Sequence, residues 1–136
     1  MSPIVYDVTP YDRAGHEAFV KSSWVRGARQ PWDALADRLR RPEARCLVAN
    51  APGKPDTLYG WAAVDNAIQA VIFAYTRSWP SGCRRRGLMT GLLLEMGFDL
   101  SRSTRCLYWT PIATKLAERG YRLIFSPEPK RAAAAA

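Results

Sequence analysis

Ala70-Val-Ile-Phe-Ala-Tyr-Thr76 is an apolar run that predicts a strand, and the basic stretch Arg84-Arg-Arg-Gly-Leu-Met-Thr-Gly-Leu-Leu93 follows it closely. Apolar residues then recur at every fourth position, namely Leu88, Leu92, Met96 and Leu100. This spacing predicts a helix that begins directly behind Gly87. The first turn of a helix has main-chain N–H groups without partners, and the helix dipole favours negative charge there. Gly87, which has no side chain, would let a bulky anion approach the main chain. The stretch therefore predicts a phosphate site between strand and helix, with arginines adding charge-assisted contacts.

Other interpretations of this stretch stay open. Three consecutive arginines also occur in solvated turns and at nucleic-acid contacts. Two common phosphate loops are excluded, because the chain has no G-x-x-x-x-G-K-[ST] pattern and its glycines do not form G-x-G-x-x-G.

The segment Arg84-Arg85-Arg86-Gly87-Leu88-Met89 resembles the acyl-CoA loop of the GNAT superfamily of N-acetyltransferases, whose pattern is Gln/Arg-x-x-Gly-x-Gly/Ala at a strand-to-helix junction. The match holds at Arg84 and Gly87, and Met89 departs from it. The resemblance implies acetyl-CoA as the cofactor, with its pyrophosphate held at this loop. The residues so implied are Arg84, Arg85, Arg86, Gly87, Leu88, Met89 and Thr90.

The order of elements extends the resemblance. Residues 106–111, 112–119 and 120–125 are similar to the family's fifth strand, last helix and final strand, and the Gly120-Tyr121 pair matches its Gly-Phe/Tyr junction. Residues 11–26 and the Trp109-Thr-Pro segment together resemble small GNAT-like proteins of bacteriophages and prophages.

The fold that we expect is mixed α/β, a mostly antiparallel sheet with flanking helices. A short edge strand over residues 4–8 precedes a helix capped by Asp12 or by the preceding Thr9. A second helix begins at Pro31-Trp32 and stops at Arg40-Arg41-Pro42. Strands over 45–49, 57–64 and 67–76 form a meander whose first connection is long and polar. The first helix is expected to bury one face, which consists of Ala18, Phe19, Ser22 and Val25.

Length and composition favour one domain over residues 1–125, with 126–136 as a frayed tail. The GNAT resemblance implies a splay between the fourth strand, 67–76, and the fifth, 105–110. It also implies that pantetheine is added as a strand at this splay. Main-chain N–H groups at Ala74, Tyr75 and Thr76 would then stabilise the oxyanion of the reaction.

Catalytic side chains are less clearly marked. Many family members carry a tyrosine acid on the last helix, and the matching position here is Leu116. Tyr108 and Tyr75 are the alternative hydroxyls, and Asp65, which ends a strand, is the candidate base. Each also suits a structural role, in the core, at its rim or in a turn.

The remaining candidates concern the acceptor and metals. Trp24 and Trp109 lie at the ends of elements, where they would wall an acceptor pocket. His16 stands next to Glu17, which suggests surface pairing. Because it is the only histidine and the three cysteines lack paired spacing, we expect no metal site and no disulfide framework.

Charge and hydropathy limit the partners. The net charge of +8 favours phosphate- or carboxylate-bearing ligands, but the arginines are dispersed and form no stripe with stacking aromatics, so nucleic acid is the lesser alternative. No membrane-length apolar stretch or secretory signal pattern is present, and we expect a cytoplasmic protein.

The sequence predicts an acetyl-CoA-dependent N-acetyltransferase acting by direct attack of an amine, of a small molecule or a protein. The alternatives are an inactive CoA-binding or protein-interaction module and a nucleic-acid-contacting protein, and either a monomer or a dimer fits.

Overall fold

The computed structural model describes residues 5–77, 88–108 and 111–125, and side chains are described for these except at 111 and 112. Within these ranges, the strands and helices follow in the order β1 (Asp7–Pro10), α1 (Arg13–Ala28), α2 (Trp32–Leu39), β2 (Ala44–Ala51), β3 (Lys54–Asp65), β4 (Ala70–Thr76), α3 (Leu88–Glu95), β5 (Thr104–Cys106), α4 (Pro111–Glu118) and β6 (Leu123–Phe125). The strands form one sheet in the order β1-β2-β3-β4-β5-β6. Pairing is antiparallel from β1 to β4 and parallel from β4 to β6. The predicted mixed, mostly antiparallel sheet with flanking helices is confirmed.

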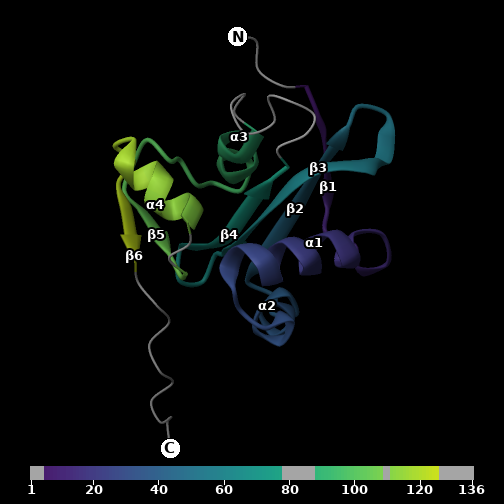
Figure 1. The fold of residues 1–136 in the computed structure, drawn as a ribbon, viewed down its shortest axis with the longest axis horizontal. Helices are drawn as coiled ribbons and strands as arrows, with labels where there is room; N and C mark the ends of the chain where they lie inside the picture. The colour runs from purple at the N-terminus through teal and green to yellow at the C-terminus, as the bar shows by residue number, and fades with distance from the viewer. Residues whose placement is uncertain (1–4, 78–87, 109–110, 126–136) are drawn as a thin grey trace, which may run out of the picture.

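The helices lie on both faces of the sheet (Figure 1). Helices α1 and α2 pack on one face, and α3 covers the other. Helix α4 joins α3 on that second face, where the two helices line a common cavity. The chain crosses from β4 through α3 to β5, and then from β5 through α4 to β6, in the same direction along the sheet. Because such crossovers are almost always right-handed, both helices belong on one face.

Two apolar clusters hold the layers together, and the central strands supply both. On the α3 face, the buried residues include Leu47, Ala62, Val64, Leu88 and Leu92. On the α1 and α2 face, they include Val20, Trp24, Leu35, Val48, Trp61 and Ile72. Adjacent residues such as Leu47 and Val48 therefore point to opposite clusters, as the two-residue period of a strand requires.

Of the two predicted caps of the first helix, the structure selects Asp12, but the predicted buried face of this helix is wrong. Asp12 precedes α1, and its carboxylate accepts from the Gly15 N–H at 3.2 Å. The face that the sheet covers consists of His16, Val20, Ser23 and Trp24, whereas Val25 is 44% exposed and Ala18 and Ser22 are also exposed. The buried face includes two polar residues, which hydrophobicity alone assigns to solvent.

Both polar residues have hydrogen bonds that make burial tolerable. The Ser23 hydroxyl accepts from the indole N–H of Trp61 at 2.6 Å and donates to the Phe19 carbonyl. His16 Nδ1 accepts from the main-chain N–H of Asp12 at 2.9 Å. The expected surface pairing of His16 is therefore corrected, and Glu17 pairs with Arg13 instead.

Several strand boundaries differ from the predicted ones. Strand β1 covers Asp7–Pro10 rather than residues 4–8, and β4 begins at Ala70 because residues 66–69 form a turn. The β2–β3 connection is short, since Ala51 faces Lys54 across the hairpin with only two residues between them. Gly53 there has a φ of 69°, a value that glycine adopts without strain.

Helix α3 ends earlier than the apolar spacing predicts. The Phe98 N–H donates to the Leu93 carbonyl at 2.8 Å, and the intervening Gly97 has a φ of 88°, as at many helix C-termini. Leu100 lies beyond the helix but is still buried. No helix among the described residues has both the length and the apolar character needed to cross a bilayer.

Candidate functional site at the β4–β5 gap

Strands β4 and β5 separate after two residue pairs. Ala70 faces Arg105 and Val71 faces Cys106, and the Leu107 N–H donates to the Val71 carbonyl at 3.0 Å. Strand β4 continues to Thr76, paired on its other side with β3. Among the described residues, no strand pairs with the β5-facing edge of β4 beyond Val71. The predicted parting between the fourth and fifth strands is thus observed, and we call it the β4–β5 gap.

The hydrogen-bond alternation of β4 decides which main-chain groups face this gap. The Arg77 N–H donates to the Tyr59 carbonyl at 2.8 Å, so Arg77 faces β3. Groups in an antiparallel pair alternate between neighbours, so those of Tyr75 also face β3, and those of Ala74 face the gap. Of the predicted main-chain donors, Thr76 shares the orientation of Ala74, while Tyr75 pairs with Trp61 within the sheet.

A small apolar cavity lies at the gap, and its wall includes residues of both core clusters, such as Leu93 of the α3 face and Ile72 of the α1 and α2 face. Its volume is about 40 Å³, and its wall includes residues of β4, β5, α3 and α4. The polar side chains in this wall belong to Thr104, Cys106 and Tyr108. Burial raises the pKa of the Cys106 thiol to about 11, so this sulfur is a neutral thiol at pH 7 and a poor nucleophile.

Two of the predicted catalytic hydroxyls are placed differently. Tyr108 is half-buried, lines the cavity, and packs edge-on against Trp24 with ring centroids 5.1 Å apart. Tyr75 is also half-buried, but its ring contacts Phe19 of α1 at 5.8 Å and it is not part of the cavity wall. Of these two candidates, the structure brings Tyr108 to the cavity.

Trp24 lies inside the protein. Its side chain is fully buried, its indole N–H donates to the Pro31 carbonyl at 3.0 Å, and its ring packs against Phe73 at 5.4 Å. Trp24 therefore packs against the rings of Tyr108 and Phe73 inside the core, and its side chain has no solvent-exposed surface that an acceptor could contact. Trp109, the other predicted pocket residue, lies outside the described residues.

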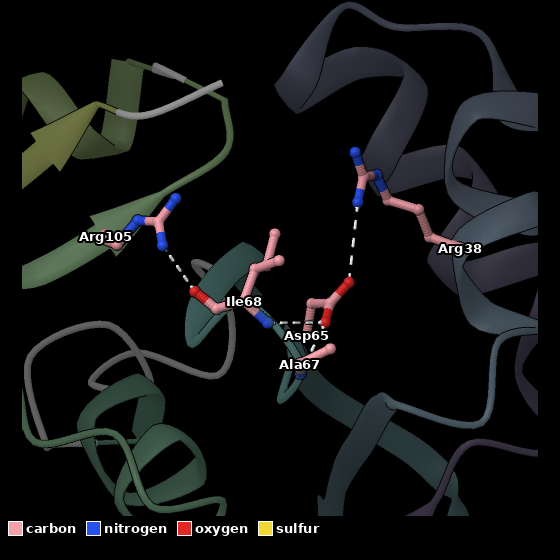
Figure 2. Close-up of polar contacts among 5 residues, drawn as sticks. All are labelled: Arg38, Asp65, Ala67, Ile68 and Arg105. Atoms are coloured by element: carbon pink, nitrogen blue, oxygen red, sulfur yellow. Dashed lines mark hydrogen bonds and ion pairs between the residues drawn. The ribbon is translucent and has the colours of Figure 1, made fainter. Parts of the chain in front are cut away.

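Asp65 lies at the far end of β4 from Thr76. It pairs with Ala70 at the start of β4, and Figure 2 shows its carboxylate turned into the β3–β4 turn. One oxygen accepts from the N–H groups of Ala67 and Ile68 at 2.9 and 3.3 Å, and the other lies 3.9 Å from Nη1 of Arg38. The proximity that suggested a catalytic base is absent, because antiparallel pairing puts the end of β3 beside the beginning of β4.

This turn also holds β5 in place. The Arg105 guanidinium donates to the Ile68 carbonyl at 2.7 Å, next to the Asp65 contacts (Figure 2). Both Arg38 and Asp65 are buried, with side chains 8% and 3% exposed. This buried pair was not predicted from the sequence, because an arginine near a helix end ordinarily lies in solvent. Its one signal in the sequence is Asp65-Asn66, which marks the turn.

The residues predicted to hold the pyrophosphate are only partly described. Arg84, Arg85, Arg86 and Gly87 lie outside the described residues, as does Cys83. Leu88, Met89 and Thr90 are the first described residues of α3. Leu88 is buried, Met89 lines the cavity, and Thr90 is exposed.

The last helix contributes an apolar wall. Leu116, at the position where the resemblance implies a tyrosine, lines the cavity together with Ala113. The described part of α4 thus supplies no hydroxyl to the cavity, and the residues of this wall that sequence reasoning missed include Leu93, Thr104 and Cys106. Cys106 stands out in the sequence only as a thiol within a short apolar segment.

Comparison with known proteins gives limited similarity. No protein-family model matches the chain, and no curated protein sequence matches it. Among solved structures, the chain is similar to the crystal structure of a ribosomal-protein-alanine N-acetyltransferase from Brucella melitensis biovar Abortus 2308. The identity is 19% and the TM-score 0.46, over 93% of this chain and 82% of that one.

Proposed function

We propose that this chain binds a coenzyme A thioester along the open edge of β4 and transfers its acyl group, acetyl in the first instance, to an amine. The β4–β5 gap carries the proposal. A sheet that opens after Val71 while β4 runs on to Thr76 exposes a strand edge inside the protein rather than at its rim. Such an edge suits an extended ligand that can complete the ladder.

The pantetheine arm of coenzyme A has the chemistry for this edge. It contains two amides, and the Ala74 N–H and carbonyl face the gap. A buried main-chain group without a partner costs about 1 to 3 kcal/mol, so a ligand amide there gains from satisfying it. The arginine-rich stretch that ends at Gly87, with the first turn of α3, is our proposed pyrophosphate site.

The proposed reaction is a direct acyl transfer. The amine nitrogen forms a bond to the thioester carbon, the carbon–sulfur bond breaks, the nitrogen loses a proton and the departing thiolate gains one. A main-chain N–H in the gap is suited to stabilising the oxyanion, and Ala74 is the proposed donor. Tyr108 is the proposed acid for the thiolate, because it is the candidate hydroxyl in the cavity wall.

The acceptor amine must arrive unprotonated. An alkylamine has a pKa of about 10 and is mostly charged at pH 7, so a base or a bound water must take its proton. Asp65 is not proposed for this role, since its carboxylate is held in the β3–β4 turn. The acceptor class that we propose is an amine of a small molecule or a protein.

A second candidate function is coenzyme A binding without turnover. Leu116 supports this alternative. The resemblance implies a tyrosine that acts as an acid at this position, and Leu116, which lines the cavity, has no proton to donate. This alternative shares the cofactor with our main proposal and differs in its chemistry.

Calorimetry with acetyl-CoA and dephospho-CoA tests the cofactor first. We expect binding of acetyl-CoA that weakens when the 3′-phosphate is absent, and a Gly87→Val variant that loses affinity while its free energy of unfolding stays within about 1 to 2 kcal/mol of the parent. Absence of any binding refutes both functions. Thiol release with a panel of amines then separates them, since a binding module releases no thiol above the rate without protein.

A further inference from the structure

Arginines that lie apart in the sequence come together where β5 and β6 begin. The Thr104 N–H donates to the Arg122 carbonyl at 2.9 Å, so the turn before β5 lies beside the turn before β6. A hollow opens between these two turns, and its wall includes Ser101, Arg119, Tyr121 and Arg122. We call it the turn hollow. Arginines that are dispersed along the sequence are therefore partly gathered in space.

The turn hollow is cationic and open to solvent. Tyr121 and the two arginines of the wall are exposed, as is Arg102 in the turn before β5. Among the described residues, no ion pair involves the two wall arginines. The acids closest in sequence, Asp99 and Glu118, lie outside the described wall, and the Asp99 carboxylate accepts from the Ser101 N–H and hydroxyl at 2.9 and 2.7 Å. The hollow thus presents positive charge to an external anion.

The turn hollow lies at the opposite end of β5 from the β4–β5 gap. Strand β5 begins at Thr104 beside the hollow, and β4 and β5 part after Cys106. The hollow is also at one side of the molecule, because β6 is the edge strand of the sheet (Figure 1). A ligand held between the two turns therefore leaves the gap open.

We propose that the turn hollow binds single-stranded nucleic acid, with phosphates at Arg102, Arg119 and Arg122 and a base stacked on Tyr121. Guanidinium groups bind phosphate oxygens through charge-assisted, often paired hydrogen bonds. An exposed aromatic ring beside them suits a single strand, whose bases have free faces for stacking.

Two other anionic partners match this surface less well. A duplex presents phosphates but keeps its base faces stacked inside, so it leaves the Tyr121 ring unused. An acidic peptide matches the charge and also has no flat base for this ring. The proposed site uses no residue of the gap, so it does not depend on the proposed coenzyme A chemistry.

Fluorescence anisotropy of the full chain with a labelled uridine dodecamer tests the proposal. We expect a micromolar Kd at low salt, and a log–log slope of affinity against salt of about −2, because three phosphate contacts each contribute about −0.7. A polyglutamate peptide of the same length should bind about tenfold more weakly or less. Absence of binding to the dodecamer, or equal binding of the peptide, overturns the proposal.

A double variant, Arg119→Gln with Arg122→Gln, tests the location of the site. It should lower the affinity for the dodecamer about tenfold or more and reduce the magnitude of the salt slope by about 1.4, since two phosphate contacts are lost. The matched control is Arg26→Gln with Arg29→Gln, which removes the same charge from exposed residues at the end of α1. Its Kd should stay within about threefold of the parent. Equal losses in the two variants would mean that only the overall charge matters, and would overturn the site.

Tyr121→Ala tests the stacked base. We expect the affinity for the dodecamer to fall about fivefold or more, and Tyr121→Phe, which keeps the ring, to bind as the parent does. Thermal unfolding checks that each variant is folded, and the exposure of these side chains makes a large loss of stability unexpected. An unchanged affinity in Tyr121→Ala overturns the base contact, and with it the assignment to a single strand.

Discussion

Val71 and Cys106 are the last residues of β4 and β5 that face each other in register, and the Leu107 N–H closes the pair by donating to the Val71 carbonyl at 3.0 Å. Beyond this point β4 has a neighbour on one side only among the described residues. The pair thus marks where a continuous sheet becomes a gap. The Arg105 guanidinium donates to the Ile68 carbonyl at the paired end of β5. This bond holds β5 beside the start of β4, and the two strands diverge after Cys106.

The orientation of the Ala74 N–H can be tested with proline. Ala74→Pro removes a donor that faces the gap, so we expect a folded protein whose affinity for acetyl-CoA falls about tenfold or more. Tyr75→Pro is the matched control, because it removes a donor that faces β3 and should cost about 3 kcal/mol or more of unfolding free energy. Urea denaturation and calorimetry measure the two effects. Equal destabilisation by both variants would contradict the assigned orientation.

Tyr108→Phe tests the proposed proton donor. The ring and its packing against Trp24 remain, so we expect an unchanged Kd for acetyl-CoA and a kcat lowered by about 10² or more. Tyr75→Phe serves as the control, since its ring packs against Phe19 and it does not line the cavity. A kcat that is the same in the parent and in Tyr108→Phe would remove Tyr108 from the mechanism.

Asp65→Ala should destabilise the protein through the β3–β4 turn. Removing the carboxylate takes away the acceptor of two turn N–H groups, an effect of about 1 to 3 kcal/mol, and a negative charge that lies 3.9 Å from the buried Arg38. Asp37→Ala is the matched control, because its pair with Arg40 is exposed and should contribute at most about 1 kcal/mol.

The double variant Arg38→Met with Asp65→Asn refines this test. It removes both charges together and should recover part of the stability that Asp65→Ala loses. Thermal and urea unfolding of the four proteins measure the effects. If Asp65→Ala were as stable as the parent while kcat fell, the turn would not be the role of this residue, and a catalytic role would return.

Alkaline pH should destabilise the fold through its buried thiols. Burial raises the pKa of Cys106 to about 11 from 9.0, and it raises the pKa of Cys46 further. A raised native pKa means that the native state holds its proton longer than the unfolded chain. The associated stability is complete below pH 9 and is lost as pH rises through the native pKa.

For Cys106 the expected loss between pH 9 and 11 is about 1 to 2 kcal/mol, allowing for its partial exposure to solvent. Urea denaturation at pH 7, 9 and 10.5 measures it. Cys106→Ala should show a shallower decline than the parent over this window. An identical decline in both proteins would mean that other groups cause it.

The sequence by itself determined the kinds of elements and their order. Local signals sufficed wherever a local interaction decides the structure, as with the Asp12 cap, the stop at Arg40-Arg41-Pro42 and the apolar run that became β4. The parting of two strands came from the resemblance of the whole element order. These features depend on residues that are neighbours along the chain or on a connection rule that applies to every sheet.

Only the tertiary structure decided which side chains meet at the gap. Register put Asp65 beside Ala70 and away from Thr76, and the hydrogen-bond alternation turned the main chain of Ala74, rather than Tyr75, towards the opening. Packing buried Ser23, whose hydroxyl is bonded by Trp61 from a distant part of the sequence, and His16, whose ring nitrogen is bonded by the main chain of Asp12. Such outcomes depend on contacts between segments far apart in sequence, where a shift of one residue reverses which face a side chain occupies.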